Sequence, residues 1–382
     1  MLRVTAVRFS SLGDVVLTLP ALAAVRAHHP HVHITYATRE PFARLLRISP
    51  LIDQVWTLER TGGVPALAQR ARLAGTHAVL DFHDNLRSHF MTLEMGRIPT
   101  FRTPGKRLAR WRILACRGQD MHRAPDVEPV WRRHCRTVAR LLHSRVGSPP
   151  RASSPTIPTP GAWDPSQERA RASLPLLCAD AGASWADQHL PRGATRVALL
   201  PGARYANKRW PALAYRALAG RLESSGVVPV LFGSADEVPL LQFVAEGARH
   251  AVLVPSDWPI MVAALHRCRT AVGNDSGLTH LAEAVGTPVV ALFGPTTPAF
   301  GFGPRLALST VIQQHTRCRP CTRHGGNSCR TGDHRCLATI TPDEVAAVVL
   351  ETISKHEALK DMPHPGLRPN GFGRSCLYLR IP

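Results

Sequence analysis

The sequence lacks long apolar runs and is poor in aromatic residues, which make up 6% of its 382 residues. No apolar run approaches the length of a membrane-spanning helix, so an integral membrane protein is not expected. The hydrophobic fraction is nevertheless 44% and the charged fraction 19%, as in globular proteins with a packed core. A chain of this length is sufficient for two ordinary domains.

A secretory signal peptide is not expected either. Residues 1–7 read as a short strand interrupted by Arg3, without the apolar region and the small-residue cleavage site of a signal peptide. The nine cysteines are an odd number and five of them are scattered, which suits reduced thiols. We therefore expect a cytoplasmic protein whose contact with a membrane is peripheral.

Acidic residues are scarce relative to basic ones. The chain has 27 Asp and Glu against 47 Lys and Arg, and residues 86–145 alone carry fourteen Lys or Arg and four Asp or Glu. The net charge of +20 implies an anionic partner, whether nucleic acid, acidic lipid or a phosphorylated substrate. A solvated basic face with a compositional bias fits the same counts. Nucleic acid is not expected, because no helix-turn-helix, zinc-finger, RRM or KH signature is present.

The first strand, expected over residues 2–9, is followed by a loop without the G-x-G-x-x-G fingerprint of dinucleotide-binding proteins. This loop, Ser10–Asp14, has one glycine and a carboxylate where a pyrophosphate would approach, which argues against NAD or FAD. Asp14 stands at the start of a helix expected to run through Val25, open to a cleft, and suits a general base. The alternative is an acidic residue that only stabilises the helix N-terminus.

Strands and helices alternate through the rest of the first half, which predicts parallel βαβ units. The expected strands are 31–37, 54–58 and 78–82, with a helix over 42–48. Residues 148–160 are rich in Pro and Ser and read as a surface loop. A new strand over 197–200 opens the second half.

The loop after this strand, Pro201–Pro211, suits a diphosphate. Gly202 gives access to the backbone, Lys208 supplies a mobile positive charge, and Arg204 is a weaker candidate. A Walker A sequence is absent. The next strand, 228–232, leads to Asp236 and Glu237, either of which could bind ribose hydroxyls.

Residues 270–304 read as strand, turn, helix, strand and turn. The turn Gly273–Gly277 precedes a helix over 278–285, and Ser276 and Gly277 place backbone N–H donors at its N-terminus, where phosphate binds well. Asp275 can accept hydrogen bonds from sugar hydroxyls, and His280 is expected to face the same binding site. The alternative makes Asp275 a helix cap and His280 a packed polar residue.

Four cysteines near the C-terminus are spaced C-x2-C-x7-C-x6-C, at Cys318, Cys321, Cys329 and Cys336. The first pair has metal-ligand spacing, and four thiolates could hold a structural zinc ion. Because the intervals are irregular, reduced cysteines without a metal are the expectation. No metal is expected in catalysis.

Five segments occur in one order along the chain: RFSSLGDVVLTLPALAAVRAHHP, DFHDNLRSHFMTLEMG, LLPGARYANKRWP, LFGSADE and GNDSGLTHLAEAVGTPVVALFGPT. Together they resemble glycosyltransferase family 9, the lipopolysaccharide heptosyltransferases, from about Leu2 to about Leu350. The resemblance implies an α/β protein of the GT-B fold, with two Rossmann-like parallel-sheet domains facing across a cleft. It also implies that Asp14 is the catalytic base and that Lys208 contacts the diphosphate.

The resemblance implies an inverting transferase that moves a heptose or related sugar from an ADP-sugar to a lipopolysaccharide core. This acceptor is an anionic, lipid-linked glycan at the inner face of the cytoplasmic membrane. The reaction requires no cofactor. Two alternatives remain at this stage: a sugar-nucleotide epimerase of GT-B-like fold, and a non-catalytic basic protein that binds lipid or nucleic acid.

The predicted domains are 1–180 for the acceptor, 181–355 for the nucleotide sugar, and an extra tail, 356–382. The last helix is expected to end near Ile353. Candidate acceptor-binding residues are Ser10, Ser11, Gly13, Arg87, Lys106, Arg107 and Arg110. Candidate donor-binding residues are Gly202, Arg204, Lys208, Asp236, Glu237, Asp275, Ser276, Gly277 and His280.

Overall fold

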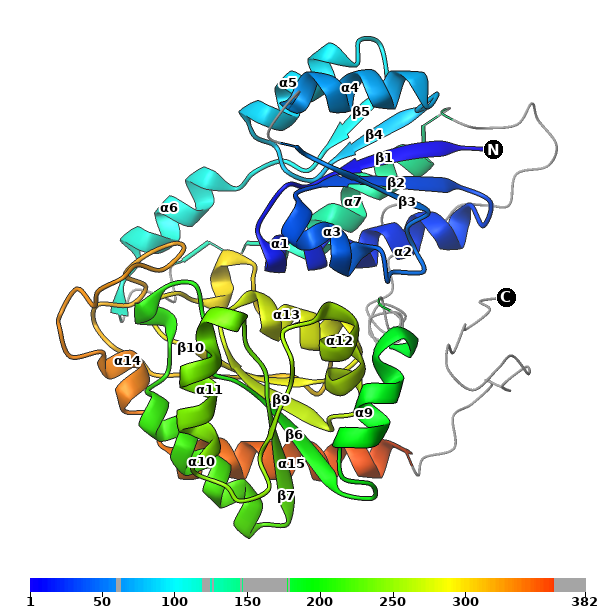
Figure 1. Ribbon diagram of the computed structural model, residues 1–382. Coiled ribbons are helices and arrows are strands. Elements are labelled where there is room, and N and C mark those ends of the chain that lie inside the picture. Colours follow the sequence, from blue (N-terminus) through cyan, green and yellow to red (C-terminus); the bar gives the residue numbers. More distant parts are fainter. Residues whose placement is uncertain are drawn as a thin grey trace. The chain divides into compact units, whose positions relative to one another are not determined.

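The computed structural model describes residues 1–59, 63–118, 124–125, 127–144, 146, 177 and 179–360. The chain divides into two compact units (Figure 1). Unit 1 comprises Met1–Gly105 and Glu128–Leu177, and unit 2 comprises Lys106–Val127 and Cys178–Pro382. Among the described helices, none is long and apolar enough to cross a membrane.

Unit 1 is built on a five-stranded sheet in the order β3-β2-β1-β4-β5. All neighbouring strands run parallel, with Val4 of β1 opposite Ile34 on one side and Ala78 on the other. The strands are β1 (Arg3–Val7), β2 (His33–Thr38), β3 (Gln54–Thr57), β4 (Ala78–Asp81) and β5 (Thr100–Arg102). The central strands are almost wholly buried, because their apolar runs lie beneath helices on both faces.

Helices cover both faces of this sheet (Figure 1). Helices α4 and α5 pack against each other, and α2 packs against α7. The helices of unit 1 are α1 (Leu12–Val16), α2 (Leu19–His28), α3 (Glu40–Leu46), α4 (Gly63–Leu73), α5 (Leu86–Glu94) and α7 (Val130–Leu142).

The helix that we expected from Asp14 through Val25 is two helices, α1 and α2, and this expectation was wrong. Pro20 lies in the first turn of α2, where its missing N–H is tolerated, but it cannot donate within a continuous helix. The Thr18 hydroxyl donates to the Val15 carbonyl at 2.7 Å and closes the end of α1.

Unit 2 is built on a six-stranded sheet in the order β11-β10-β9-β6-β7-β8, again with all neighbours parallel. Its strands are β6 (Thr195–Leu200), β7 (Val227–Leu231), β8 (Val252–Leu253), β9 (Thr270–Asn274), β10 (Val289–Phe293) and β11 (Thr310–Gln313). Two parallel α/β sheets are what the sequence predicts, and this fold class is confirmed.

The helices of unit 2 are α6 (Arg107–Ala115), α9 (Ala183–His189), α10 (Ala212–Ser224), α11 (Val238–Ala245), α12 (Trp258–His266), α13 (Gly277–Ala284), α14 (Arg335–Ala338) and α15 (Pro342–Lys360). Helix α15 continues beyond Ile353, so the helix end predicted there was too early. Helix α6 belongs to unit 2 although it precedes the predicted boundary at residue 180. The predicted loop 148–160 and the tail from residue 361 lie outside the described residues.

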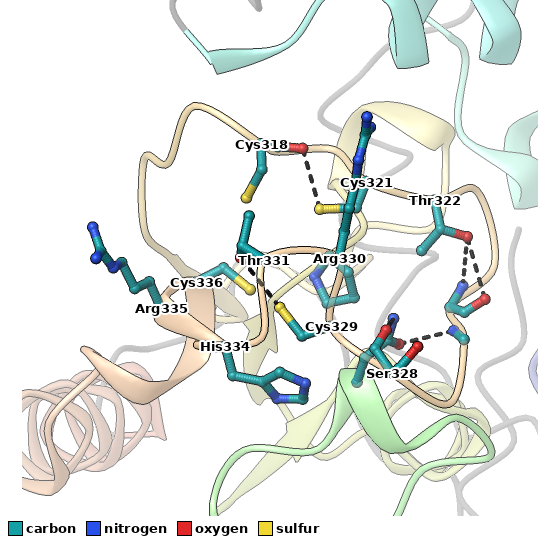
Figure 2. A pocket seen from close by; sticks show the side chains of 14 residues that line it. Cys318, Cys321, Thr322, Ser328, Cys329, Arg330, Thr331, His334, Arg335 and Cys336 are labelled. Atoms are coloured by element: carbon teal, nitrogen blue, oxygen red, sulfur yellow. Dashed lines mark hydrogen bonds between the residues drawn. The ribbon is translucent and has the colours of Figure 1, made fainter.

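The segment between β11 and α14 folds as a loop around a cavity of about 230 Å³ (Figure 2). Asn207, which belongs to the loop after β6, ties down this segment. The Gly326 amide donates to Asn207 Oδ1 at 2.9 Å, and Asn207 Nδ2 donates to the Ser328 carbonyl at 3.1 Å.

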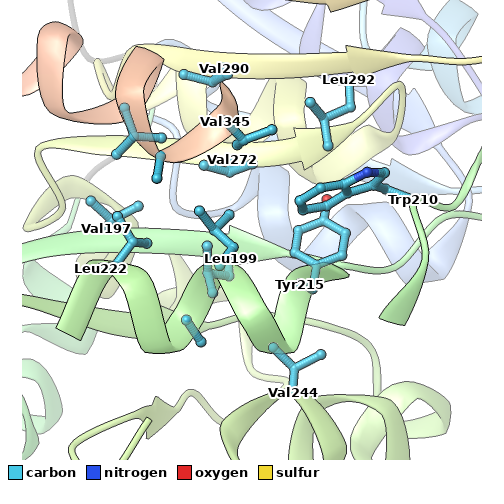
Figure 3. Packing of buried hydrophobic residues seen from close by; sticks show 14 of the residues in the cluster. Val197, Leu199, Trp210, Tyr215, Leu222, Val244, Val272, Val290, Leu292 and Val345 are labelled. Carbon is cyan, nitrogen blue, oxygen red and sulfur yellow. The ribbon is translucent and has the colours of Figure 1, made fainter. Parts of the chain in front are cut away.

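The core of unit 2 lies between the sheet and helices α10 and α15 (Figure 3). Its largest member is Trp210, which is 1% exposed and meets the Tyr215 ring edge-on at 4.9 Å between centroids. The indole N–H donates to the carbonyl of Ile340 at 3.1 Å. Trp210 therefore connects the loop after β6 to the segment that precedes α15.

We expect Trp210→Phe to lower the free energy of unfolding of unit 2 by about 2–4 kcal/mol, because it removes core volume and leaves the buried Ile340 carbonyl without its donor. Chemical denaturation followed by circular dichroism measures the change. Leu213→Ala is the control, since Leu213 is 70% exposed on α10 and should change stability by less than about 0.5 kcal/mol. Equal stabilities for wild type and Trp210→Phe would contradict the anchoring role.

Candidate active site

Each sheet has one point at which the strand order reverses. In unit 1 the chain leaves β1 toward β2 and later returns to the other side as β4, so the reversal lies between β1 and β4. In unit 2 it lies between β6 and β9. Ligands of open parallel sheets bind beyond the carboxyl ends of the strands at such points. The loops that follow β1, β4, β6 and β9 are therefore the candidate sites.

Arg8 and Asp14 form an ion pair in the loop after β1. The Arg8 guanidinium lies 2.7 Å from Asp14 Oδ1, and both side chains are less than one-fifth exposed. The same guanidinium donates to the carbonyls of Ser10 at 2.7 Å and Phe82 at 2.6 Å. Arg8 thus joins the loop after β1 to the loop after β4.

The Asp14 carboxylate also accepts two hydrogen bonds from Ser11, from the hydroxyl at 2.7 Å and from the amide at 3.2 Å. Burial by itself raises the pKa of Asp14, but the Arg8 charge and the Ser11 hydrogen bonds outweigh it and lower the pKa to about 2. Asp14 is therefore ionised at neutral pH. It both holds the start of α1 and presents a partly accessible carboxylate, so the two roles predicted for it are compatible.

His83 lies in the loop after β4 and faces the loop after β1. Its Nδ1 accepts the Phe9 amide at 2.9 Å, which assigns the remaining proton of the neutral ring to Nε2. Burial, with the Arg8 charge adding to it, lowers the pKa of His83 to about 4. The ring is accordingly a neutral hydrogen-bond donor. Buried Asp81 stiffens this loop by accepting the amides of His83 and Asp84, each at 3.0 Å.

In unit 2 the loops after β6, β9 and β10 meet at one charged contact. Lys208 Nζ lies 2.5 Å from Asp275 Oδ2, with both side chains nearly buried. Thr296, which follows β10, donates its hydroxyl to the same carboxylate oxygen at 2.7 Å. The structure therefore brings together Lys208 and Asp275, which the sequence assigned to the donor site separately.

The side chain of Asn274, at the end of β9, holds these loops in place. Its Nδ2 donates to the carbonyl of Pro201 at 2.8 Å, and its Oδ1 accepts the Trp210 amide at 2.9 Å. Its own carbonyl accepts the Thr279 hydroxyl. One fully buried side chain thus fixes both ends of the loop that carries Lys208.

Glu237 lies against Gly202 in the same loop cluster. A Cβ placed on Gly202 would come within 2.1 Å of Glu237 Oε1, so the glycine is needed for this approach. Glu237 Oε2 also accepts the Ser234 amide at 2.9 Å. Asp236, the other ribose candidate, and Arg204 are both exposed to solvent.

Ser276 and Gly277 stand at the start of α13, as predicted: Ser276 is the residue that precedes the helix, and Gly277 is its first residue. His280 is 7% exposed, and its ring lies 6.5 Å from that of Phe302. His280 is thus mostly buried beside the loop after β10, rather than exposed at the binding site as we expected.

The predicted acceptor residues fall in two different units. Ser10, Ser11 and Gly13 surround Asp14 in unit 1, and Arg87 is exposed on α5 of the same unit. Lys106, Arg107 and Arg110 belong to unit 2. There, the Arg110 guanidinium donates to the Phe300 carbonyl at 3.2 Å and lies 4.9 Å from the centroid of the Phe302 ring.

The four clustered cysteines line the cavity of unit 2 (Figure 2). Over the ranges the structure describes, no group of three or more His, Cys, Asp or Glu side chains is arranged to hold a metal ion. The Cys321 thiol donates to the Cys318 carbonyl at 3.1 Å. Burial, with the neighbouring Cys318 adding to it, raises the pKa of Cys321 to about 12, and burial raises the pKa of Cys336 to about 11. By contrast, hydrogen bonds from Thr331 help to lower the pKa of Cys329, against the opposing effect of its burial. No step is assigned to a metal here.

Comparison with known proteins gives consistent results. A family model described as glycosyltransferase family 9 (heptosyltransferase) matches residues 164–328. Lipopolysaccharide heptosyltransferase 1 of Pseudomonas aeruginosa is 27% identical over 345 residues, which cover 84% of this chain and 86% of that protein. The resemblance to glycosyltransferase family 9 is confirmed.

Solved structures extend the likeness over nearly the whole chain. A glycosyltransferase family 9 structure from Veillonella parvula has a TM-score of 0.66 at 21% identity and covers 92% of this chain and 97% of that one. An E. coli heptosyltransferase solved with ADP-2-deoxy-2-fluoro heptose has a TM-score of 0.60 at 20% identity, covering 92% and 99%. The GT-B fold prediction and the enzyme class, a glycosyltransferase, are confirmed at the level of the family.

Several residues that shape the candidate site were not singled out from the sequence: Arg8, His83, Asn207, Asn274 and Thr296. All five lie in or directly after the quoted segments, immediately beyond strand ends or in the loops that follow. That position was the only signal, because each acts through a partner distant in sequence.

We expect Arg8→Gln to raise the pKa of Asp14 by about 1–3 units, because it removes the positive charge that opposes burial. Carbon NMR titration of the carboxyl, assigned by comparison with Asp14→Asn, measures the shift. The lowered pKa means that ionised Asp14 stabilises the fold above about pH 4 and loses that contribution as the pH falls toward 2. Arg26→Gln, which breaks the separate 2.7 Å ion pair with Asp53, is the matched control and should leave Asp14 unchanged. An unaltered titration in Arg8→Gln would contradict this account of the pair.

Proposed function

We propose that this protein is an inverting glycosyltransferase that moves a heptose or related sugar from an ADP-sugar to a lipopolysaccharide core acceptor. The family match and the name of the Pseudomonas aeruginosa relative support the reaction class and the acceptor. The ADP-heptose analogue named with the E. coli structure supports the donor. The observation that carries the proposal is the convergence of Lys208, Asp275 and the start of α13 at the strand reversal of unit 2.

Lys208 and the amides of Ser276 and Gly277 supply positive charge for the diphosphate. As the bond from the sugar to the diphosphate breaks, negative charge grows on the leaving group, and these donors stabilise it. Donor binding requires Lys208 to exchange the Asp275 carboxylate for a phosphate oxygen. Asp275, still held by Thr296, is then free to accept hydrogen bonds from the sugar hydroxyls.

Glu237 is the better candidate for the ribose hydroxyls. Its carboxylate lies over Gly202 in the loop that approaches the diphosphate, whereas Asp236 is exposed to solvent. A carboxylate beyond the second strand of such a unit accepts hydrogen bonds from ribose and repels phosphate, so it also sets the orientation of the nucleotide.

Asp14 accepts the proton of the attacking acceptor hydroxyl, while Ser10, Ser11 and Gly13 shape the surrounding loop. The new carbon–oxygen bond forms as the diphosphate leaves, through a transition state with oxocarbenium character. The hydroxyl becomes strongly acidic as this bond forms, so a carboxylate with a low pKa can receive its proton late in the step. His83, as a neutral Nε2–H donor beside this loop, can orient the acceptor.

The acceptor implied by this function is an anionic, lipid-linked glycan. We therefore propose peripheral contact with the inner face of the cytoplasmic membrane, which the net charge of +20 favours electrostatically. Arg87 is the exposed basic residue of unit 1 that we assign to acceptor binding. Lys106, Arg107 and Arg110 of unit 2 are proposed to contribute from their own unit.

We expect calorimetry to show preferential binding of ADP-sugar over UDP- and GDP-sugar, and Lys208→Ala to weaken ADP binding by about 10- to 100-fold through loss of a charge-assisted contact. Asp275→Asn should not weaken ADP binding, since it releases Lys208 from its ion pair. Lys355→Ala, on α15 of the same unit, is the control for loss of a lysine. Preference for a UDP-sugar would change the assigned donor from an ADP-sugar to a UDP-sugar. Failure to bind any nucleotide sugar would refute the transferase.

We expect Asp14→Asn to reduce the transfer rate by at least about a hundredfold with ADP affinity unchanged, because only the proton-accepting step is lost. A radiolabelled donor with a lipid A–Kdo acceptor measures transfer. Near-normal transfer by Asp14→Asn would restrict Asp14 to capping α1. Product formation from the donor alone, without acceptor, would instead support an epimerase.

A further inference from the structure

Helix α5 exposes three large apolar side chains along one face. Leu86 is 90% exposed, Phe90 45% and Leu93 74%. They are spaced four and three residues apart, so they align on the helix surface, while Ser88, Met91 and Thr92 face the protein interior. We call Leu86, Phe90 and Leu93 the α5 stripe. A row of this kind on a short helix marks an interaction surface.

Exposed basic residues lie close to the α5 stripe in the sequence and on the neighbouring helix α4. Arg87 and Arg97 are exposed at its two ends, and Glu94 is the single acidic residue in the sequence from Leu86 to Arg97. Helix α4 packs beside α5 and exposes Arg72 together with Leu73, which is 81% exposed. An apolar row flanked by guanidinium groups is complementary to a surface of acyl chains beneath anionic headgroups.

The α5 stripe begins at the edge of the sheet that carries the proposed base. Leu86 follows the loop after β4, in which the His83 ring accepts the Phe9 amide and the Phe82 carbonyl accepts Arg8, the partner of Asp14. The first inserted side chain would therefore lie at the same end of unit 1 as Asp14. A lipid-linked acceptor is presented at its membrane surface, so the stripe and the base would meet it from the same edge.

We propose that the α5 stripe docks unit 1 on an anionic lipid bilayer, with Leu86, Phe90 and Leu93 among the headgroups and Arg72 and Arg97 against phosphate. Its relevance to catalysis rests on the proposed function, because only a lipid-linked acceptor requires it. A second copy of the chain is a poorer occupant. Two copies paired along α5 would bring arginines of like charge together across a narrow apolar row.

The test is flotation of the full chain with two kinds of vesicle: phosphatidylethanolamine with phosphatidylglycerol, and phosphatidylcholine alone. We expect wild type to float with the anionic vesicles, and the triple variant Leu86→Gln/Phe90→Gln/Leu93→Gln to bind at least about tenfold more weakly. Leu213→Gln is the matched control, a 70% exposed leucine on α10 of unit 2 that should float as wild type does. Circular dichroism melting verifies that the triple variant is folded.

The charge contribution is tested by Arg72→Gln/Arg97→Gln. This variant should lose most of the preference for anionic vesicles, at about fivefold per removed charge, with a matching loss of salt sensitivity. Wild type that floats with neither kind of vesicle, or a triple variant that floats as well as wild type, overturns the proposal. Sedimentation that shows a wild-type dimer and a monomeric triple variant would also overturn it, by making the stripe a contact between copies.

Activity measurements separate this proposal from the proposed function. The triple variant should retain transfer to a delipidated, water-soluble acceptor and lose at least about fivefold of transfer to the same glycan embedded in vesicles. Stripe-dependent flotation by a protein that transfers no sugar would refute the transferase and leave the docking surface standing. Equal transfer to embedded acceptor by wild type and triple variant would refute the docking role while leaving the transferase intact.

Discussion

The arrangement of the candidate sites depends on one constraint: parallel strands deliver all their carboxyl ends to the same edge of a sheet. In each unit the chain moves first to one side of the sheet and then to the other, so two adjacent strand ends are left with loops that diverge. In unit 1 these loops carry Asp14 and His83, and in unit 2 they carry Lys208 and Asp275. Diverging loops leave room beside two adjacent strand ends, and the polar groups lie in those loops.

Hydrogen bonds from buried polar side chains fix the conformations of these diverging loops. Asn274 satisfies the carbonyl of Pro201 and the amide of Trp210, and Trp210 in turn binds the carbonyl of Ile340. Asn207 extends the same network to the cysteine-bearing loop. In unit 1, Arg8 has the equivalent role, because it spans two loops and pairs with Asp14. Each of these groups would be costly to leave without a partner, so the loops have little freedom to shift independently.

The sequence was sufficient to predict the parallel α/β class, most strand positions and the loops that hold the candidate residues. Apolar runs and turn residues, which carry these predictions, are local signals. The sequence located the strand Val289–Phe293 as the structure has it and placed the start of α13 within one residue. It did not reveal the break between α1 and α2, where Thr18 and Pro20 divide one apolar pattern. Nor could it pair Lys208 with Asp275 or Asn274 with Pro201, since these partners are separated by more than sixty residues.

The membership of α6 in unit 2 has a consequence for how the two units can be separated. The backbone passes between the units at residues 105–106, 127–128 and 177–178, three times in all. A fragment that ends near residue 105 lacks α7, the packing partner of α2, and one that ends after α7 carries α6 without the Phe300 and Phe302 that Arg110 contacts. Neither half can therefore be cut out as an intact body.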